Sequence, residues 1–131
     1  MAEAVTKKRP RPKNLDLTTI RLPLPGFVSI LHRISGFGLF LMLPVLLWLF
    51  QSSLTSADTY ETFKAFVAHP VAKLLLLGLI WAYMHHFCAG LRFLALDFHM
   101  GIDLESARLS SKIVLGVSLI ATAIIGVTVL W

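Results

Sequence analysis

Three long apolar runs constrain the fold of this chain more than any other feature. They cover residues 27–50, 71–96 and 113–131 of its 131 residues. At a helical rise of about 1.5 Å per residue, roughly 20 apolar residues cross the hydrocarbon core of a bilayer. Backbone polar groups in lipid must be satisfied within their own segment, which favours helices. The sequence therefore predicts an all-α, multi-pass membrane protein, a single domain (residues 1–131) with three transmembrane helices.

The composition also favours lipid over water as the surrounding medium. Hydrophobic residues make up 56% of the chain and charged residues 15%, against about 45–50% and 25% in soluble domains. A soluble domain of this size has too little interior to bury that much apolar surface. The net charge of +5 is compatible with nucleic acid binding, but the basic residues flank the apolar runs, as cytoplasmic charges do. We therefore expect lipid, and no nucleic acid, around this chain.

The distribution of Lys and Arg predicts the orientation. The tail, residues 1–26, holds six of the 12 Lys and Arg residues, the first connection holds Lys64, and the second holds Arg108 and Lys112. Because positive charge collects on cytoplasmic flanks, the tail and the second connection are predicted to be cytoplasmic. The basic start lacks the apolar run and cleavage site of a signal peptide, which is typical of a mature protein of the bacterial inner membrane. A short interfacial helix is expected at residues 59–68.

A polar face opens the first apolar run. Its members, spaced i, i+3, i+4 and i+7 along one side of a helix, are Ser29, His32, Arg33 and Gly36. An Arg this close to the end of a span can reach lipid phosphates, so an interfacial anchor is one interpretation. The other is the wall of a polar pocket, which would offer donors to a quinone carbonyl or a cation to a carboxylate. The residues alone leave both interpretations open.

The second run carries a histidine pair deep in the membrane. His86 lies 11 residues before Asp97 at the end of the run, which is about 16 Å at helical rise. Gly90, one turn away on the same face, leaves room for a flat group such as a haem, whose iron takes an imidazole nitrogen. A hydrogen bond to another helix is the alternative. His85 points about 100° away around the helix, so we expect it to be structural. Arg92 is positioned to pair with a haem propionate or with Asp97.

Three segments resemble the signatures of a known family. They read RPKNLDL at residues 11–17, SILHRISG at residues 29–36 and HFCAGLRFLALD at residues 86–97. In order and spacing the chain is similar, over nearly its whole length, to the cytochrome b subunit of succinate dehydrogenase, the larger membrane anchor of complex II. The patterns Ser-x-x-His-Arg-x-Ser-Gly and His-x-x-x-Gly-x-Arg are each fairly specific, and together they carry the resemblance.

The resemblance implies a haem b held between this chain and a second membrane anchor subunit, with one axial histidine from each. In this sequence the iron ligand corresponds to His86. The cofactor-binding positions near the haem correspond to His32, Arg33 and Arg92. A ubiquinone site at the cytoplasmic edge corresponds to Ser29 and Arg33.

The resemblance also implies partners and a pathway. Electrons would come from succinate through a flavoprotein subunit and an iron–sulfur subunit, joining the tricarboxylic acid cycle to electron transport. This chain would contribute to the quinone-reduction site without holding a complete active site of its own. The alternatives are a small oligomeric transporter or proton channel that uses His85 and His86 as a relay, or a structural anchor without cofactor. The third run carries no charge, and we expect it to serve packing only.

Overall fold

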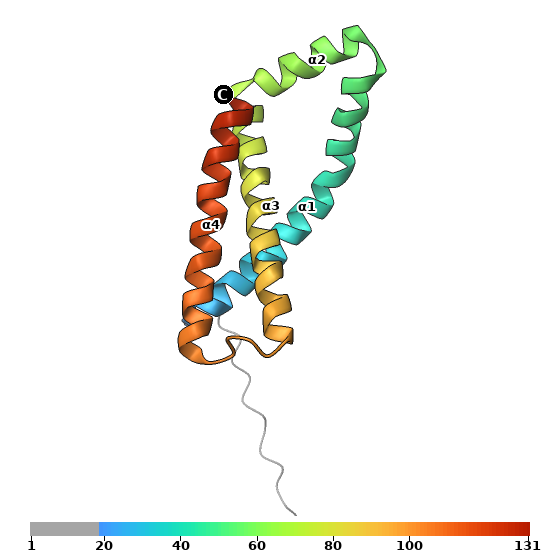
Figure 1. Cartoon of the computed structure of the whole chain (residues 1–131). Coiled ribbons are helices and arrows are strands. Elements are labelled where there is room, and N and C mark those ends of the chain that lie inside the picture. The colour runs from blue at the N-terminus through green and yellow to red at the C-terminus, as the bar shows by residue number, and fades with distance from the viewer. Residues whose placement is uncertain (1–18) are drawn as a thin grey trace, which may run out of the picture.

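The computed structural model describes residues 19–131. In this part of the chain it consists of the helices α1 (Leu24–Thr55), α2 (Ala57–Ala68), α3 (Pro70–Asp97) and α4 (Leu104–Leu130) (Figure 1). Three of them, α1, α3 and α4, are long and apolar enough to cross a membrane. The predicted all-α fold with three apolar spans is therefore confirmed. Most of the basic tail lies outside the described residues.

The long helices extend beyond the apolar runs because a helix ends at a cap and not at the edge of the hydrocarbon. The largest difference is in α4, which begins at Leu104, whereas the third apolar run begins at residue 113. Asp103 caps this helix, since its carboxylate accepts a hydrogen bond of 2.9 Å from the backbone N–H of Ser106. The same bond lowers the pKa of the Asp103 carboxyl. The polar first turns of α4 therefore fold as helix before the apolar part starts.

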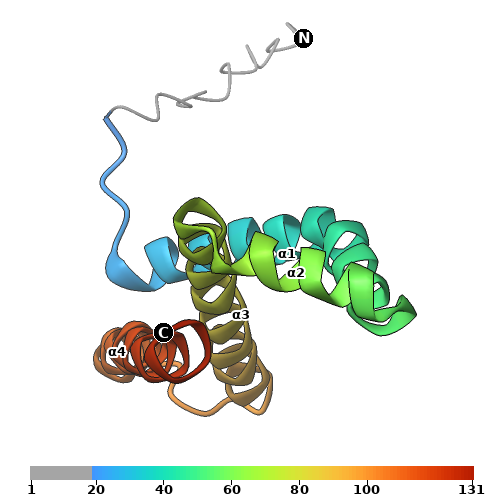
Figure 2. The same cartoon turned by 90° about the horizontal axis from the view of Figure 1, so that it is seen from above.

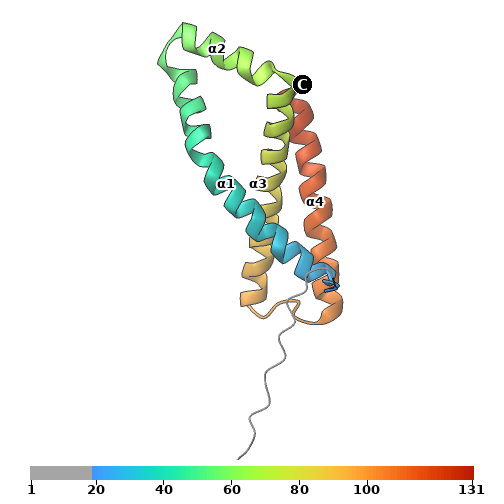
Figure 3. The ribbon, with the colours of Figure 1, turned by 180° about the vertical axis from the view of Figure 1, so that it is seen from behind.

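The helix α1 contains a proline in its interior. Pro44 has no backbone N–H, so one carbonyl of the preceding turn loses its helical partner. Figure 3 shows α1 changing direction in its middle part, the region that contains this proline. The first part of α1 crosses α3 at a slant, so the two helices are close at one end and apart at the other (Figure 3).

The helix α2 bridges that separation. It joins the far ends of α1 and α3 and lies across them (Figures 1 and 3). Its start is fixed by a capping box, in which Ser56 and Thr59 exchange side-chain and backbone hydrogen bonds. A helix was expected at residues 59–68, and the structure confirms it with an earlier start at Ala57. An exposed ion pair between Lys64 and Glu61, 2.8 Å apart, lies on its surface.

The helix α3 is the centre of the packing, with α1 and α4 both against it (Figure 2). A small apolar cluster of Val28, Ala89 and Val114 joins the three spans, and Cys88 and Leu115 pack beside it. Most other large apolar side chains of the spans are exposed. A surface of this kind is stable only against lipid or a partner protein.

The third span packs against α1 and α3, and its buried face has a feature that the apolar sequence did not indicate. Its buried face carries hydroxyl groups as well as apolar side chains: Ser111, Ser118 and Thr122 are buried. Each hydroxyl donates to a carbonyl of α4 itself. In a lipid environment this internal bonding lets small polar residues lie at a helix interface.

Gly126 of α4 lies close to the side chain of Leu77 on α3, and replacing it by alanine is expected to destabilise the fold. An added Cβ would lie 2.6 Å from Cδ1 of Leu77. Because that atom ends a flexible side chain, we expect a cost at the low end of the overpacking range, about 1 kcal/mol. Thermal unfolding in detergent measures it. Gly116→Ala is the matched control, since its Cβ would meet nothing within 4 Å; equal stability of the two variants would contradict the packing described.

Candidate functional site

The imidazole of His86 is held by α1 in one defined orientation. Its Nδ1 lies 3.0 Å from the backbone carbonyl oxygen of His32. A carbonyl oxygen only accepts, so Nδ1 carries the proton and Nε2 carries the lone pair. The hydroxyl of Ser35 donates to the same carbonyl at 2.9 Å and lies 3.4 Å from Nδ1. The structure thus fixes the tautomer that leaves Nε2 able to bind a metal.

Stacking on the imidazole of His32 also restrains the imidazole of His86. The imidazoles of His32 and His86 are stacked, with ring centroids 4.1 Å apart and an interplanar angle of 13°. Phe93 follows on the other side of His32, at 5.2 Å between centroids. The lone pair of Nε2 lies in the plane of its ring, so a stacked neighbour limits rotation without covering that lone pair.

Gly36 is the residue that makes room for His86. A Cβ at this position would lie 2.6 Å from Cε1 and 3.0 Å from Nδ1 of His86. Gly90, which the sequence pattern predicts to leave room for a flat group such as a haem, does not make room for His86 itself. A Cβ at Gly90 would only make ordinary contact, at 3.8 Å, with Cε1 of His32. The tight approach depends on how α1 crosses α3, which the spacing along one helix does not reveal.

Ser29 and Arg33 lie one turn apart at the start of α1. Ser29 is half-buried and Arg33 is exposed. With His32 between them, they belong to the part of α1 that packs near α3 and α4, away from the divergent end (Figure 1). The predicted polar face therefore divides in the structure: His32 and Gly36 contact α3, while the guanidinium of Arg33 is open to the surroundings.

Arg92 contacts α4. Its Nε donates a hydrogen bond of 2.9 Å to the hydroxyl of Ser110. Its guanidinium carbon also lies 5.7 Å from the centroid of the Phe93 ring. Of the two partners suggested by the sequence, Asp97 is not bonded to Arg92 among the described residues. The link from Arg92 to Ser110 joins the last turns of α3 to the first turns of α4, on the side that the charge pattern predicts to be cytoplasmic.

The two adjacent histidines have different surroundings. His86 is half-buried, whereas His85 is fully buried with 0% of its surface exposed. The ring of His85 lies 5.5 Å from that of Trp81, between centroids. Neither ring nitrogen of His85 has a hydrogen-bond partner among the described residues, and the same is true of Nε1 of Trp81. The sequence analysis expected His85 to be structural, but it did not identify Trp81 as its neighbour.

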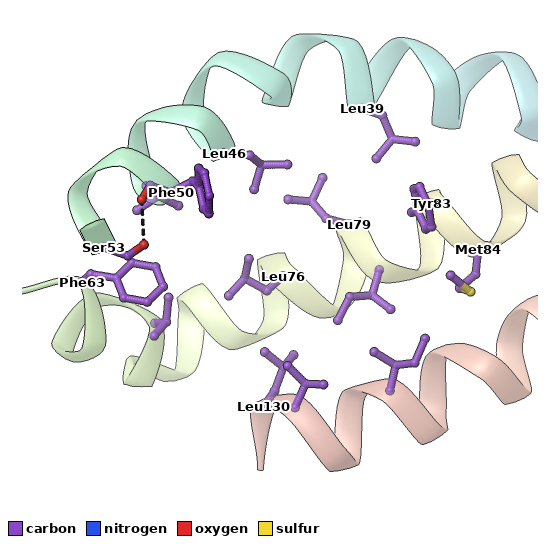
Figure 4. A pocket seen from close by; sticks show the side chains of 15 residues that line it. Leu39, Leu46, Phe50, Ser53, Phe63, Leu76, Leu79, Tyr83, Met84 and Leu130 are labelled. Atoms are coloured by element: carbon purple, nitrogen blue, oxygen red, sulfur yellow. Dashed lines mark hydrogen bonds between the residues drawn. The ribbon is translucent and has the colours of Figure 1, made fainter. Parts of the chain in front are cut away.

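An apolar hollow lies between the helices, next to α2. Its volume is about 790 Å³, and all four helices line it. Figure 4 shows the side chains around it: Leu39, Tyr83 and Met84 lie at one end and Phe50 and Phe63 at the other. The hydroxyl of Ser53 is already used, because it donates to the carbonyl of Phe50 at 2.6 Å. The hollow therefore offers an apolar surface to whatever occupies it.

Comparison with known proteins identifies the family of this chain. The family model of the succinate dehydrogenase/fumarate reductase transmembrane subunit matches residues 7–125. The chain is 36% identical over 118 residues to the succinate dehydrogenase cytochrome b556 subunit of Coxiella burnetii, covering 89% of this chain and 94% of that one. It is 31% identical over 110 residues to the subunit of that name from Paracoccus denitrificans, covering 84% and 85%. The resemblance found in the motifs is confirmed: the chain belongs to the family of succinate dehydrogenase/fumarate reductase transmembrane subunits.

Proposed function

We propose that this chain is the haem b- and quinone-binding membrane anchor of a succinate:quinone oxidoreductase in a bacterial inner membrane. A second anchor subunit shares the haem, and a flavoprotein and an iron–sulfur subunit deliver electrons from succinate to ubiquinone at the cytoplasmic side. The observation that carries the proposal is the orientation of His86, whose Nδ1 is bound by the His32 carbonyl while Nε2 keeps its lone pair. The relatives are named cytochrome b556 subunits, which supports a b-type haem.

The residues present suit a haem iron as the metal. His86 offers one nitrogen, and no group of three or more His, Cys, Asp or Glu side chains is arranged to hold a metal ion within residues 19–131. A porphyrin would bind the iron through its own nitrogens, so His86 would be the residue of this chain that holds the iron, together with one histidine of the second anchor subunit. A haem b supplies a one-electron redox centre when it is bound. A histidine that binds a metal usually donates its other ring N–H to a protein oxygen. The hydrogen bond from Nδ1 of His86 to the His32 carbonyl is such a contact.

Side chains around His86 suit the propionates of a haem. Arg33 is exposed, so its guanidinium can meet a carboxylate without leaving an existing partner. Arg92 uses Nε for Ser110, which leaves its terminal nitrogens as donors to an anion. His32 is already stacked on the proposed ligand. We propose that these three residues orient the cofactor relative to Nε2 of His86.

Ser29 and Arg33 form the proposed quinone site. One turn apart at the start of α1, they provide a hydroxyl donor and a cation at the predicted cytoplasmic edge. A quinone carbonyl oxygen becomes more negative as the ring is reduced, so donors aimed at that oxygen stabilise the reaction. Arg33 would hold the carbonyl electrostatically, and Ser29 would donate a hydrogen bond to it.

Replacing Arg33 by alanine is expected to lower quinone reduction by about 100-fold, the scale on which one positioned donor acts. Ser29→Ala, which removes a neutral donor, is expected to lower it by about 10-fold. Succinate oxidation by a soluble artificial acceptor should stay at the wild-type rate, because those electrons leave before they reach this chain. Both rates are measured on the purified complex.

Arg108→Ala provides the control for this pair of variants. Arg108 is an exposed cation on another helix, α4, and its loss should leave both activities unchanged. An Arg33 variant that loses the two activities equally would indicate failed assembly and would count against a quinone site. An Arg33 variant with normal quinone reduction would reject the assignment outright.

A further inference from the structure

The helix α3 buries two aromatic nitrogen-bearing rings that have no polar partner. His85 is completely buried, and neither of its ring nitrogens is hydrogen-bonded among the described residues; Nε1 of Trp81 is buried and unbonded as well. The two residues are one turn apart, and their ring centroids are separated by 5.5 Å. Within a bilayer no bulk water can reach such groups, so leaving them unsatisfied is costly.

The register of α3 against α4 is defined at both ends of their contact. At one end the side chain of Leu77 reaches the Cα of Gly126 so closely that a Cβ there would lie 2.6 Å away. At the other end Arg92 is bonded to Ser110. The helices run antiparallel (Figure 1), so each step forward on α3 is a step back on α4.

Between these ends, the same register brings hydroxyl groups level with the unbonded rings. Trp81 falls opposite Thr122, and His85 falls opposite Ser118. Ser118 is 0% exposed and Thr122 is 7% exposed. Their hydroxyls donate to carbonyls of α4, at 3.0 Å and 2.7 Å. Each hydroxyl oxygen therefore keeps a lone pair with which it can accept a further hydrogen bond.

We propose that one ordered water molecule is bound in this interface, between Trp81 and His85. The water accepts from the indole N–H of Trp81, donates one proton to the unprotonated nitrogen of His85, and donates the other to the hydroxyl oxygen of Ser118. Three hydrogen bonds are typical of a buried water. The backbone of Val28, on α1, lies near the His85 ring. It does not meet the geometry of a hydrogen bond to either ring nitrogen, and it can satisfy one of them at most.

This site is separate from the proposed haem and quinone sites. It uses the face of α3 that meets α4, about 100° around the helix from His86. Its water links the packed helices at three points in a region where the apolar contacts are few. The site also gives His85 a role as a water ligand, which explains a buried imidazole beside the proposed iron ligand without requiring it to bind iron.

The hydrogen bond of the Trp81 indole tests the proposal, and ultraviolet resonance Raman spectroscopy of the intact complex measures it. Subtracting the spectrum of Trp81→Phe from that of the wild type isolates this indole from Trp48 and Trp131. We expect the N–H-sensitive band at its hydrogen-bonded frequency. A band at the frequency of a free indole N–H would overturn the proposal.

A second pair of variants separates water from a direct bond to a hydroxyl. The variant Thr122→Val removes the hydroxyl level with Trp81, which the proposed water does not use, so the indole band should keep its bonded frequency. Loss of the bonded frequency in this variant would show that the Thr122 hydroxyl accepted directly from the indole, which overturns the water. Thr128→Val is the control, since this exposed threonine on α4 also donates to backbone carbonyls and should have no effect.

Discussion

Replacing His86 by alanine is expected to abolish the b-type haem absorption of the assembled complex. Nε2 of His86 carries a lone pair because Nδ1 is bound to the His32 carbonyl at 3.0 Å, and alanine offers the iron no atom to bind. A reduced-minus-oxidised difference spectrum of the purified complex measures the loss. The flavoprotein and iron–sulfur subunits should still oxidise succinate with an artificial acceptor, which shows that the rest of the complex is intact.

His85→Leu is the matched control for this variant. It removes the neighbouring imidazole, which is fully buried and whose ring lies 5.5 Å from that of Trp81, between centroids. We expect the haem absorption to remain. If His86→Ala kept the wild-type spectrum, or if the His85 variant lost it while the His86 variant did not, the ligand assignment would be wrong.

Gly36→Ala is expected to produce the second largest effect, through a residue that need not touch the haem. Its Cβ would lie 2.6 Å from Cε1 of His86 and 3.0 Å from Nδ1. The ring has to move, and moving it breaks either the bond to the His32 carbonyl or the stacking on His32. Losing an outer contact of a metal ligand typically lowers metal affinity by about 10- to 100-fold. Haem content per complex, measured while free haem is titrated during reconstitution, reports the change.

Gly38→Ala isolates the steric effect from the change in helix propensity. Gly38 lies on the same helix, and a Cβ there would meet nothing within 4 Å. It should leave haem content at the wild-type level. Normal haem affinity in both variants would mean that His86 is not confined as the structure indicates, and the geometric support for the proposed ligand would be lost.

The sequence predicts the number and type of the spans well, because the physical signal is local. An apolar run long enough to cross the hydrocarbon is visible in the residues themselves. The ends of the helices are not visible in the same way, because α4 starts after its cap at Asp103, well before its apolar part. The buried hydroxyls of α4 were also missed, because a serine in an apolar run looks the same whether it faces lipid or another helix.

In the candidate site, too, features of a single helix can be predicted from the sequence, whereas contacts between helices cannot. The depth of His86 and its spacing to Gly90 are properties of one helix, and they singled out the residue whose Nε2 is free for a ligand. The contact between Gly36 and His86 joins two helices that are far apart in sequence, and it depends on their crossing. The difference between His85 and His86 is likewise set by packing: His85 is fully buried, while the His32 carbonyl of α1 orients the ring of His86.

The most direct test of the central claim is an experimental structure of the assembled complex with its haem. The account predicts continuous density from Nε2 of His86 to the haem iron, with Nδ1 still bound to the carbonyl of His32. Density joining the iron to His85 or His32, or an iron with both axial ligands from another subunit, would contradict it.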